Sequence, residues 1–194
     1  MGKMRICVFA ASSSRIAEDY RTAASKLGIL LAKSGIEVVF GGGGIGLMGT
    51  LADAVLENGG KITGVIPSFM KKEGWGHNGL TDMIVTSDMS ERKNKMFALS
   101  DAIVALPGGV GTLEELTEAI TLKQLSLFDG PIIILNTLGY YNSLLGFIDH
   151  MISSNFMRFE HRGIWDVVST PEEVIASLNK KGRGNEEWRK IAKI

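Results

Sequence analysis

The sequence contains a single cysteine among 194 residues and no apolar run that approaches the length of a membrane span. One thiol, Cys7, cannot form an internal disulfide, which favours a reducing compartment, and the cytoplasm is expected. Cys7 lies within an apolar run, so we expect a small buried core residue. The apolar stretch near the N-terminus is too short for a signal peptide, and no membrane partner is expected.

Neither sign of charge predominates. Lys and Arg together number 21, and Asp and Glu also number 21. A balanced chain has no general electrostatic attraction for nucleic acid or for an anionic membrane, so neither is expected as a partner. Any contact with a phosphate group must therefore come from a local site.

Histidine is scarce and scattered. The three histidines are His77, His150 and His161, with no H-E-x-x-H motif and no cysteine partner near any of them. A protein zinc site needs several such ligands at defined spacings, so no metal site is expected.

The sequence as a whole has an alternating pattern of apolar and amphipathic segments. Short, nearly continuous apolar runs, typical of parallel strands covered on both faces, alternate with amphipathic stretches. This alternation predicts a single doubly wound, Rossmann-like α/β domain over residues 1–180, with a charged tail over residues 181–194. In such folds, ligands bind outside the carboxyl ends of the strands.

The expected elements follow from these runs. Strands are expected over residues 5–10, 36–40, 61–66, 82–87, 101–106, 131–136 and 164–168. Helices are expected over residues 16–34, 46–58, 88–100, 111–125 and 140–153, with a last helix from Pro171 and a loop over residues 70–80.

A first glycine turn joins the second strand to a helix. Gly44, Gly46 and Gly49 fit the pattern G-x-G-x-x-G, and we expect Gly43 and Gly44 to contact a ligand. A dinucleotide site would also need an acidic residue at the end of the next strand, which instead ends at residues 65–68 without one. NAD is therefore disfavoured, and tight packing of helix on sheet remains an alternative reason for the glycines.

A second glycine turn, residues 107–112, closes the strand DAIVAL and precedes a helix. Thr112 and Glu115 fit the capping box T-x-x-E, so Glu115 has a purely structural alternative. The pattern also predicts an apolar stripe at Leu113, Leu116 and Ile120, with Glu114, Glu115 and Glu118 away from it. A carboxylate beside a phosphate cradle would suit a sugar that becomes cationic as it loses its base.

A third segment, SDMSERKNKM (87–96), places Arg92 and Lys93 side by side near a helix start. The alternative interpretation is that Arg92 and Lys93 are ordinary charged residues on a solvated helix surface. The arginine fork nevertheless suits phosphate or carboxylate, and this helix also begins just after a strand, like the helices that follow the glycine turns.

Together, GGGGIGLMG, SDMSERKNKM, LPGGVGTLEEL, ITLKQL and LNTLGYYNSLLGFID resemble the Lonely Guy (LOG) family over residues 5–178. Its members are cytokinin riboside 5′-monophosphate phosphoribohydrolases, often labelled lysine decarboxylases. The resemblance implies hydrolysis of an N-glycosidic bond, releasing a free base and ribose 5-phosphate, without a cofactor. It also implies a homodimer with sites near the interface, and residues 111–125 and 139–145 are candidate contact surfaces.

Carried over by position, the resemblance implies that Arg92 and Glu115 are the catalytic pair. It implies substrate contacts at Met89, Lys93, Gly108, Gly109, Val110, Gly111, Thr112 and Glu114. The family usually reads M-H-x-R-K where this chain has Ser90 after Met89, so the base preference stays open.

Two other functions remain open at this point. One is a non-catalytic protein that binds a nucleotide or a phosphorylated cofactor, and the other is a broader nucleosidase acting on AMP and other nucleotides. Lysine decarboxylation would need a pyridoxal-phosphate lysine with supporting partners, and no residue of the sequence indicates one.

Overall fold

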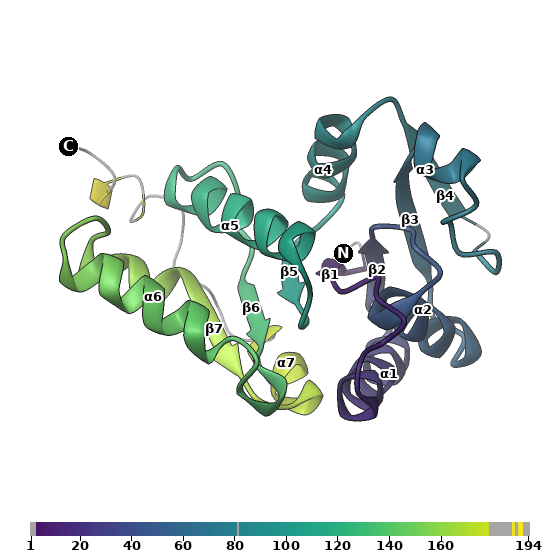
Figure 1. Ribbon diagram of the computed structural model, residues 1–194, viewed down its shortest axis with the longest axis horizontal. Coiled ribbons are helices and arrows are strands. Elements are labelled where there is room, and N and C mark those ends of the chain that lie inside the picture. The colour runs from purple at the N-terminus through teal and green to yellow at the C-terminus, as the bar shows by residue number, and fades with distance from the viewer. Residues whose placement is uncertain (1–2, 81, 179–187, 189, 192–194) are drawn as a thin grey trace.

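The computed structural model describes residues 3–80, 82–178, 188, 190 and 191 (Figure 1). Its strands are β1 (Arg5–Phe9), β2 (Glu37–Phe40), β3 (Ile62–Pro67), β4 (Asp82–Thr86), β5 (Ala102–Ala105), β6 (Ile132–Leu135) and β7 (Trp165–Val168). Its helices are α1 (Glu18–Lys33), α2 (Gly46–Glu57), α3 (Ser68–Lys72), α4 (Met89–Ala98), α5 (Val110–Gln124), α6 (Asn142–Ser153) and α7 (Pro171–Leu178). Two short 3-10 turns are η1 (Thr137–Gly139) and η2 (Phe159–Ile164).

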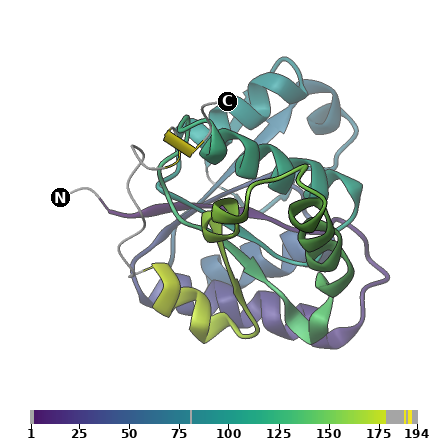
Figure 2. The ribbon, with the colours of Figure 1, turned by 90° about the vertical axis from the view of Figure 1, so that its left-hand side faces the viewer.

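All of these strands are parallel and form one sheet, in the order β4-β3-β2-β1-β5-β6-β7. Helices α1, α2 and α7 cover one face and helices α4 and α5 cover the other (Figure 2). The strands β5 and β6 are buried throughout, as expected for strands covered on both sides. The predicted doubly wound α/β fold is confirmed.

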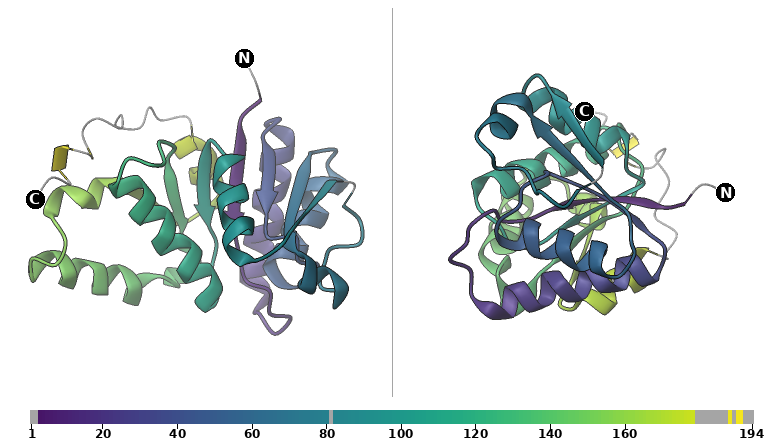
Figure 3. Two further views of the ribbon diagram at one scale, coloured as in Figure 1. Left: turned by 90° about the horizontal axis from the view of Figure 1, so that it is seen from above. Right: turned by 90° about the vertical axis from the view of Figure 1, so that its right-hand side faces the viewer.

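The sheet reverses its winding between β1 and β5. The chain moves outward from β1 through β2 and β3 to β4, and then returns to place β5 on the other side of β1, so that β1 lies at the boundary between the two halves (Figure 3). The loops that follow these two central strands meet, because the Ala11 amide donates to the Pro107 carbonyl at 3.2 Å. A reversal of this kind opens a crevice at the carboxyl ends of the strands.

Three predictions at the level of elements need correction. Residues 68–72 of the segment before β4 form helix α3, which ends at Lys72 and is followed by Gly74 with a positive φ of 75°. Five residues are too few to show a helical period in sequence. The helix expected over residues 140–153 begins two residues later, at Asn142, and follows the short turn η1, in which Leu138 has a φ of 53°. Helix α5 begins one residue early, at Val110.

The predicted boundary between domain and tail, at residues 180–181, lies outside the described residues. Of the predicted tail the structure describes only three residues, and the indole of Trp188 is buried in the core on the α5 side. Within the described residues, no helix combines the length and the apolar character that spanning a bilayer requires.

Candidate active site

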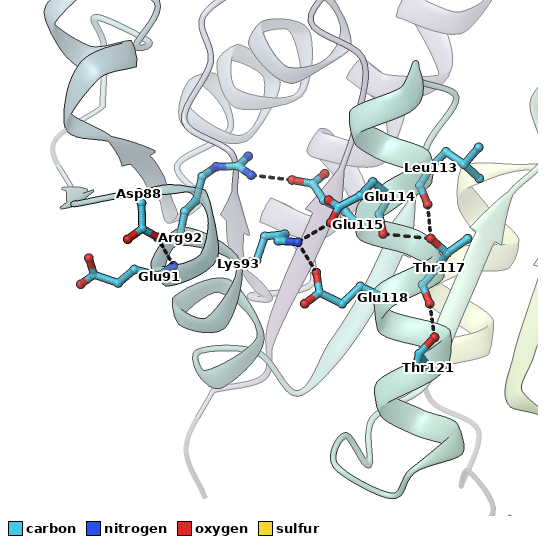
Figure 4. Close-up of polar contacts among 10 residues, drawn as sticks. All are labelled: Asp88, Glu91, Arg92, Lys93, Leu113, Glu114, Glu115, Thr117, Glu118 and Thr121. Atoms are coloured by element: carbon cyan, nitrogen blue, oxygen red, sulfur yellow. Dashed lines mark hydrogen bonds and ion pairs between the residues drawn. The ribbon is translucent and has the colours of Figure 1, made fainter.

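Helices α4 and α5 face each other across the crevice and are joined by a buried ion pair (Figure 4). The Nη1 atom of Arg92 lies 2.6 Å from Oε1 of Glu115, and both residues are at most 7% exposed. The Nε–H of the same guanidinium donates to the Val65 carbonyl in β3, at 3.1 Å. The fork of Arg92 is therefore fixed by both the sheet and the facing helix.

The Glu115 carboxyl is held in a mostly dry environment. Burial raises the pKa of Glu115 above its ordinary value, while the charge and the hydrogen bond of Arg92 act in the opposite direction. A carboxylate with a raised pKa in a cleft is a common feature of catalytic sites.

The capping-box reading of Glu115 is wrong. Helix α5 has Gly109 at its N-cap position with no side-chain cap, and the Glu115 carboxylate accepts a hydrogen bond from Arg92 instead. The predicted apolar stripe is confirmed for Leu116 and Ile120, which are buried, but Leu113 is 37% exposed and Glu115 is buried instead of lying away from the core. Burial of Glu115 is possible because the guanidinium supplies a partner inside the protein.

A capping arrangement does exist at the start of α4. The Asp88 carboxylate accepts a hydrogen bond from the Glu91 amide at 2.8 Å, and the Glu91 carboxylate accepts from the Ser87 amide at 2.7 Å. These bonds satisfy donors that the helix itself leaves free. They also fix the first turn of α4, which carries Met89 and Arg92.

The second glycine turn leaves the start of α5 open. The first backbone bond of this helix runs from the Leu113 amide to the Gly109 carbonyl, so the amides of residues 110–112 precede the intrahelical ladder. A Cβ atom on Gly109 or Gly111 would meet no atom within 4 Å. The turn thus combines free amides with empty space, which is the arrangement that binds anions at helix N-termini.

The first glycine turn is explained mainly by close packing. A Cβ atom on Gly49 would lie 2.4 Å from the Gly44 carbonyl oxygen, and Gly46 has a positive φ of 69°. These contacts confirm the expectation of tight packing for Gly46 and Gly49. Gly43 and Gly44 belong to the same turn and line the cavity described next.

A cavity of about 590 Å³ opens at the crevice, a size typical of small-molecule sites. Among its walls are nine of the residues predicted from sequence: Gly43, Gly44, Met89, Arg92, Gly109, Val110, Gly111, Thr112 and Glu115. Three predicted residues do not line it. Gly108 packs against Thr112, which a Cβ atom at position 108 would meet at 2.1 Å, while Lys93 and Glu114 pair with each other beside the cavity.

Sequence reasoning missed several other walls of the cavity, namely Ala10, Ala11, Ser12, Gly41, Ile45, Met48, Ile66 and Met70. For Trp75, which also lines the cavity, the sequence left open whether the side chain covers a pocket or only packs. The loop that carries Trp75 is attached to the first glycine turn by two backbone bonds, from Gly44 N to Trp75 O at 3.1 Å and from His77 N to Gly42 O at 2.9 Å. The glycines on either side of Trp75 could have indicated this contact between the loop and the turn, because glycine permits close approach of two backbones.

No group of three or more potential metal ligands occurs among the residues that the structure describes. His77 pairs with Asp53 at 2.9 Å, and His161 meets the Gln124 amide at 3.0 Å. Both imidazoles thus have local structural partners.

Comparison with known proteins identifies the family of this chain. Residues 48–178 match the family model described as "Possible lysine decarboxylase". Cytokinin riboside 5′-monophosphate phosphoribohydrolase LOG1 of Arabidopsis thaliana is 46% identical over 90% of this chain and 82% of its own length. The LOG4 relative from the same plant is 44% identical over 91% of this chain and 82% of its own length.

Among solved structures, the molybdenum cofactor carrier protein of Chlamydomonas reinhardtii superposes with a TM-score of 0.69. The match covers 91% of this chain and 96% of the carrier at 24% identity, and it shows a shared fold. The family model and the plant relatives are more specific: the chain belongs to the Lonely Guy (LOG) family, whose model bears the description of possible lysine decarboxylases.

Proposed function

We propose that this protein hydrolyses the N-glycosidic bond of nucleoside 5′-monophosphates, including cytokinin riboside 5′-monophosphates, to a free base and ribose 5-phosphate. The observation that carries the proposal is the buried Arg92–Glu115 pair, which lines the same cavity as the open N-terminus of α5. A nucleotide offers matching features, an anionic end and a sugar carbon that becomes cationic as its base departs.

The phosphate is assigned to the second glycine turn. The amides of Val110, Gly111 and Thr112 present the positive end of the α5 dipole to it, and the missing side chains at Gly109 and Gly111 leave room for its oxygens. The base is assigned to the more apolar walls around Met48, Met70, Met89 and Trp75. This orientation brings the ribose near Glu115.

In the reaction, water adds to C1′ of the ribose as the bond from C1′ to the base nitrogen breaks. The base leaves with the bonding electrons and takes up a proton, while C1′ keeps the hydroxyl group. Glu115 stabilises the cationic sugar or takes the proton from water, and such help contributes about a hundred- to ten-thousand-fold. Arg92 keeps Glu115 oriented and favours its carboxylate form despite burial.

The alternative chemistry named by the family description fits less well. A decarboxylase of the pyridoxal-phosphate type needs a lysine amine in the cavity. No lysine is among the described residues that line this cavity, and Lys93 nearby is engaged by carboxylates. A simple carrier, in turn, would have no need for a desolvated carboxylate held by arginine.

The test is product analysis with a panel of nucleoside monophosphates, including AMP and isopentenyladenosine monophosphate. Wild-type protein should release free base, and Glu115→Gln should abolish release while calorimetry still detects AMP binding. Glu57→Gln, an exposed change on α2, is the matched control and should behave like wild type. Binding of AMP by wild-type protein without any base release would instead identify a carrier.

We further propose a homodimer in the cytoplasm. Exposed apolar side chains occur at the start of α5, in and just after η1, and on α6: Val110, Leu113, Leu138, Tyr140 and Phe147. The Tyr140 hydroxyl donates to the Gly108 carbonyl at 2.7 Å, so the residues after η1 and the second glycine turn are neighbours. Exposed apolar side chains of this kind favour a protein interface. The lone buried thiol, Cys7, is compatible with a reducing compartment.

Gel filtration with light scattering tests the dimer. Leu138→Asp combined with Phe147→Asp should yield monomers, whereas Val85→Asp should not, because Val85 is exposed on β4 at the far edge of the sheet. A monomeric wild-type protein would overturn this part of the proposal.

A further inference from the structure

Two adjacent tyrosines donate hydrogen bonds to the backbone of the second glycine turn. The Tyr140 hydroxyl donates to the Gly108 carbonyl at 2.7 Å, and the Tyr141 hydroxyl donates to the Leu106 carbonyl at 2.6 Å. Gly109 lines the cavity, but neither tyrosine is among the described residues that do. The two hydroxyls therefore reach the turn from outside the cavity.

The other carbonyls of this turn also have partners. The Pro107 carbonyl accepts from the Ala11 amide at 3.2 Å, and the Gly109 carbonyl accepts from the Leu113 amide at 3.0 Å, the first backbone bond of α5. Together with the two tyrosine bonds, these contacts engage the carbonyls of residues 106–109 in succession. The direction of the backbone is thus fixed throughout the turn.

The bond from Tyr140 decides which way one peptide group faces. In a planar trans peptide, the C=O and N–H bonds point in opposite directions. Because the Gly108 carbonyl is held toward Tyr140, the Gly109 amide of the same peptide group points to the other side. That is the side on which residues 109–112 line the cavity.

The tyrosines are themselves held by the tight turn that precedes α6. The Asn136 side chain accepts from the Tyr141 amide at 2.7 Å and donates to the Asn142 side chain at 2.8 Å, which closes this turn. Gly139 supplies a positive φ of 72° within it. The two tyrosine rings meet edge to face, with their centroids 5.1 Å apart. This arrangement lets neighbouring residues donate to carbonyls two positions apart.

The two hydrogen bonds differ in their exposure. Tyr141 is 4% exposed and its acceptor belongs to Leu106, which is fully buried. Burial raises the pKa of the Tyr141 hydroxyl, which therefore remains protonated and can donate. Tyr140 is 45% exposed, so water can reach the carbonyl that it binds. A mobile water would satisfy that carbonyl without fixing its direction, whereas a hydroxyl on a packed ring does both.

We propose that Tyr140 and Tyr141 are positioning residues, whose hydroxyls hold the carbonyls of the second glycine turn away from the cavity so that the amides at the start of α5 face the phosphate of the substrate. The proposal rests on the hydrolase function proposed above. It gives the tyrosines a role in anion binding that does not depend on a dimer. If the peptide group between residues 108 and 109 turned over, a carbonyl oxygen would face the phosphate in place of an amide and would repel it.

The test compares Tyr140→Phe and Tyr141→Phe with the control Tyr20→Phe, in which the altered ring contacts that of Tyr140 at 5.9 Å between centroids. In nitrogen-15-labelled wild-type protein, inorganic phosphate should shift the amide signals of Gly109 and Gly111. The Kd for phosphate should rise about two- to tenfold in each of the first two variants, the effect of one ordinary hydrogen bond. Tyr20→Phe should bind phosphate like wild type.

Adenosine separates this effect from a general loss of order, because it has the base and the sugar but no phosphate. Its Kd should be unchanged in Tyr140→Phe, and with the best substrate this variant should show a higher KM at nearly the wild-type kcat. Equal weakening of adenosine and phosphate would make the role of the tyrosines merely structural and would overturn the proposal.

The phosphate titration needs no turnover, so its outcome is independent of the hydrolase assay. Phosphate binding that depends on the tyrosine hydroxyls would support the proposal even if no nucleotide released its base. An unchanged phosphate Kd in both phenylalanine variants would overturn it while leaving hydrolysis intact. A wild-type protein in which phosphate shifted no amide of the turn would overturn it as well.

Discussion

The guanidinium of Arg92 fills the space in which a side chain on Gly41 would stand. A Cβ atom at position 41 would lie 2.2 Å from Nη2 and 3.4 Å from Cζ of Arg92. The backbone of Gly41 does not adopt a positive φ, so glycine is required there for room and not for conformation. The first glycine turn thus makes room for the Arg92–Glu115 pair and also packs closely against α2.

Gly41→Ala should therefore displace the arginine. We expect a loss in kcat/KM on the order of 10²-fold, as for a misplacement of about 1 Å, and a loss of stability of about 1–3 kcal/mol from overpacking. Steady-state kinetics and urea denaturation measure the two effects. Gly146→Ala in α6 is the control, because its Cβ atom would meet nothing within 4 Å. Wild-type kinetics in Gly41→Ala would show that the position of the guanidinium is not critical.

The Arg92–Glu115 pair should behave as a unit in stability. Arg92→Met leaves the buried carboxyl of Glu115 without its partner, which should cost about 3–5 kcal/mol at neutral pH. The double change Arg92→Met, Glu115→Leu removes both charges and should recover most of that loss. Urea unfolding of the single and double variants at pH 7 gives the coupling energy. Additive losses would contradict the idea that burial of one charge depends on the other.

Most strands and helices were predictable because the central strands are short apolar runs covered on both faces. The residues from Val104 to Leu106 and from Ile132 to Leu135 show this plainly. The two glycine turns could also be placed at one edge of the sheet, since both follow parallel strands. Sequence thus places Gly43, Arg92 and Glu115 at one edge of the sheet, and in the structure they line one cavity.

What sequence could not supply was the choice of partners. Glu115 fits a capping box equally well, and only the approach of α4, 23 positions earlier, shows that its carboxylate pairs with Arg92. The place of Trp75 could not be predicted, because its loop has no periodicity and its position depends on backbone bonds to a distant turn. Such choices are decided by tertiary packing, which local patterns do not encode.

Gly111 should show a conflict between stability and function. It lies in the first turn of α5 with ordinary backbone angles, where alanine is the better helix former by about 0.5–1 kcal/mol. Gly111→Ala should therefore increase the free energy of unfolding, while its methyl group occupies the open space assigned to the phosphate. Urea denaturation should show the gain, and the inhibition constant for ribose 5-phosphate should rise. Unchanged inhibition would move the phosphate away from this turn.

Glu115 should make activity and stability respond to pH in opposite directions. Its pKa in the folded protein is raised above the ordinary value of 4.5, mainly by burial, so the folded state retains a proton that the unfolded chain has lost. Stability due to this group is therefore lost as pH rises from about 4.5 through its folded pKa. The reactive carboxylate forms over the same window, and activity should rise.

The measurement is the difference in unfolding free energy between wild type and Glu115→Gln at several pH values, in which other titrating groups cancel. As pH increases through this window, the unfolding free energy of wild type should fall relative to that of Glu115→Gln, while wild-type kcat/KM increases. If the unfolding free energy of wild type instead rose relative to that of the variant, Arg92 would outweigh burial and the pKa of Glu115 would be depressed.

Trp75 should contribute to binding of the base and not of the sugar phosphate. Trp75 is half exposed and lines the same cavity as the turn assigned to the phosphate, and its loop also carries His77, which pairs with Asp53. Stacking of a base on an aromatic ring is worth about 1–3 kcal/mol. Trp75→Ala should raise the KM for AMP accordingly, and Trp75→Phe should raise it less. His77→Ala should raise it by a smaller amount than Trp75→Ala, because it loosens the loop.

Inhibition by ribose 5-phosphate, which has no base, is the internal control and should stay at the wild-type level. If Trp75→Ala weakened AMP and ribose 5-phosphate equally, the ring would act on the cavity as a whole, and the base would have to lie against a different wall.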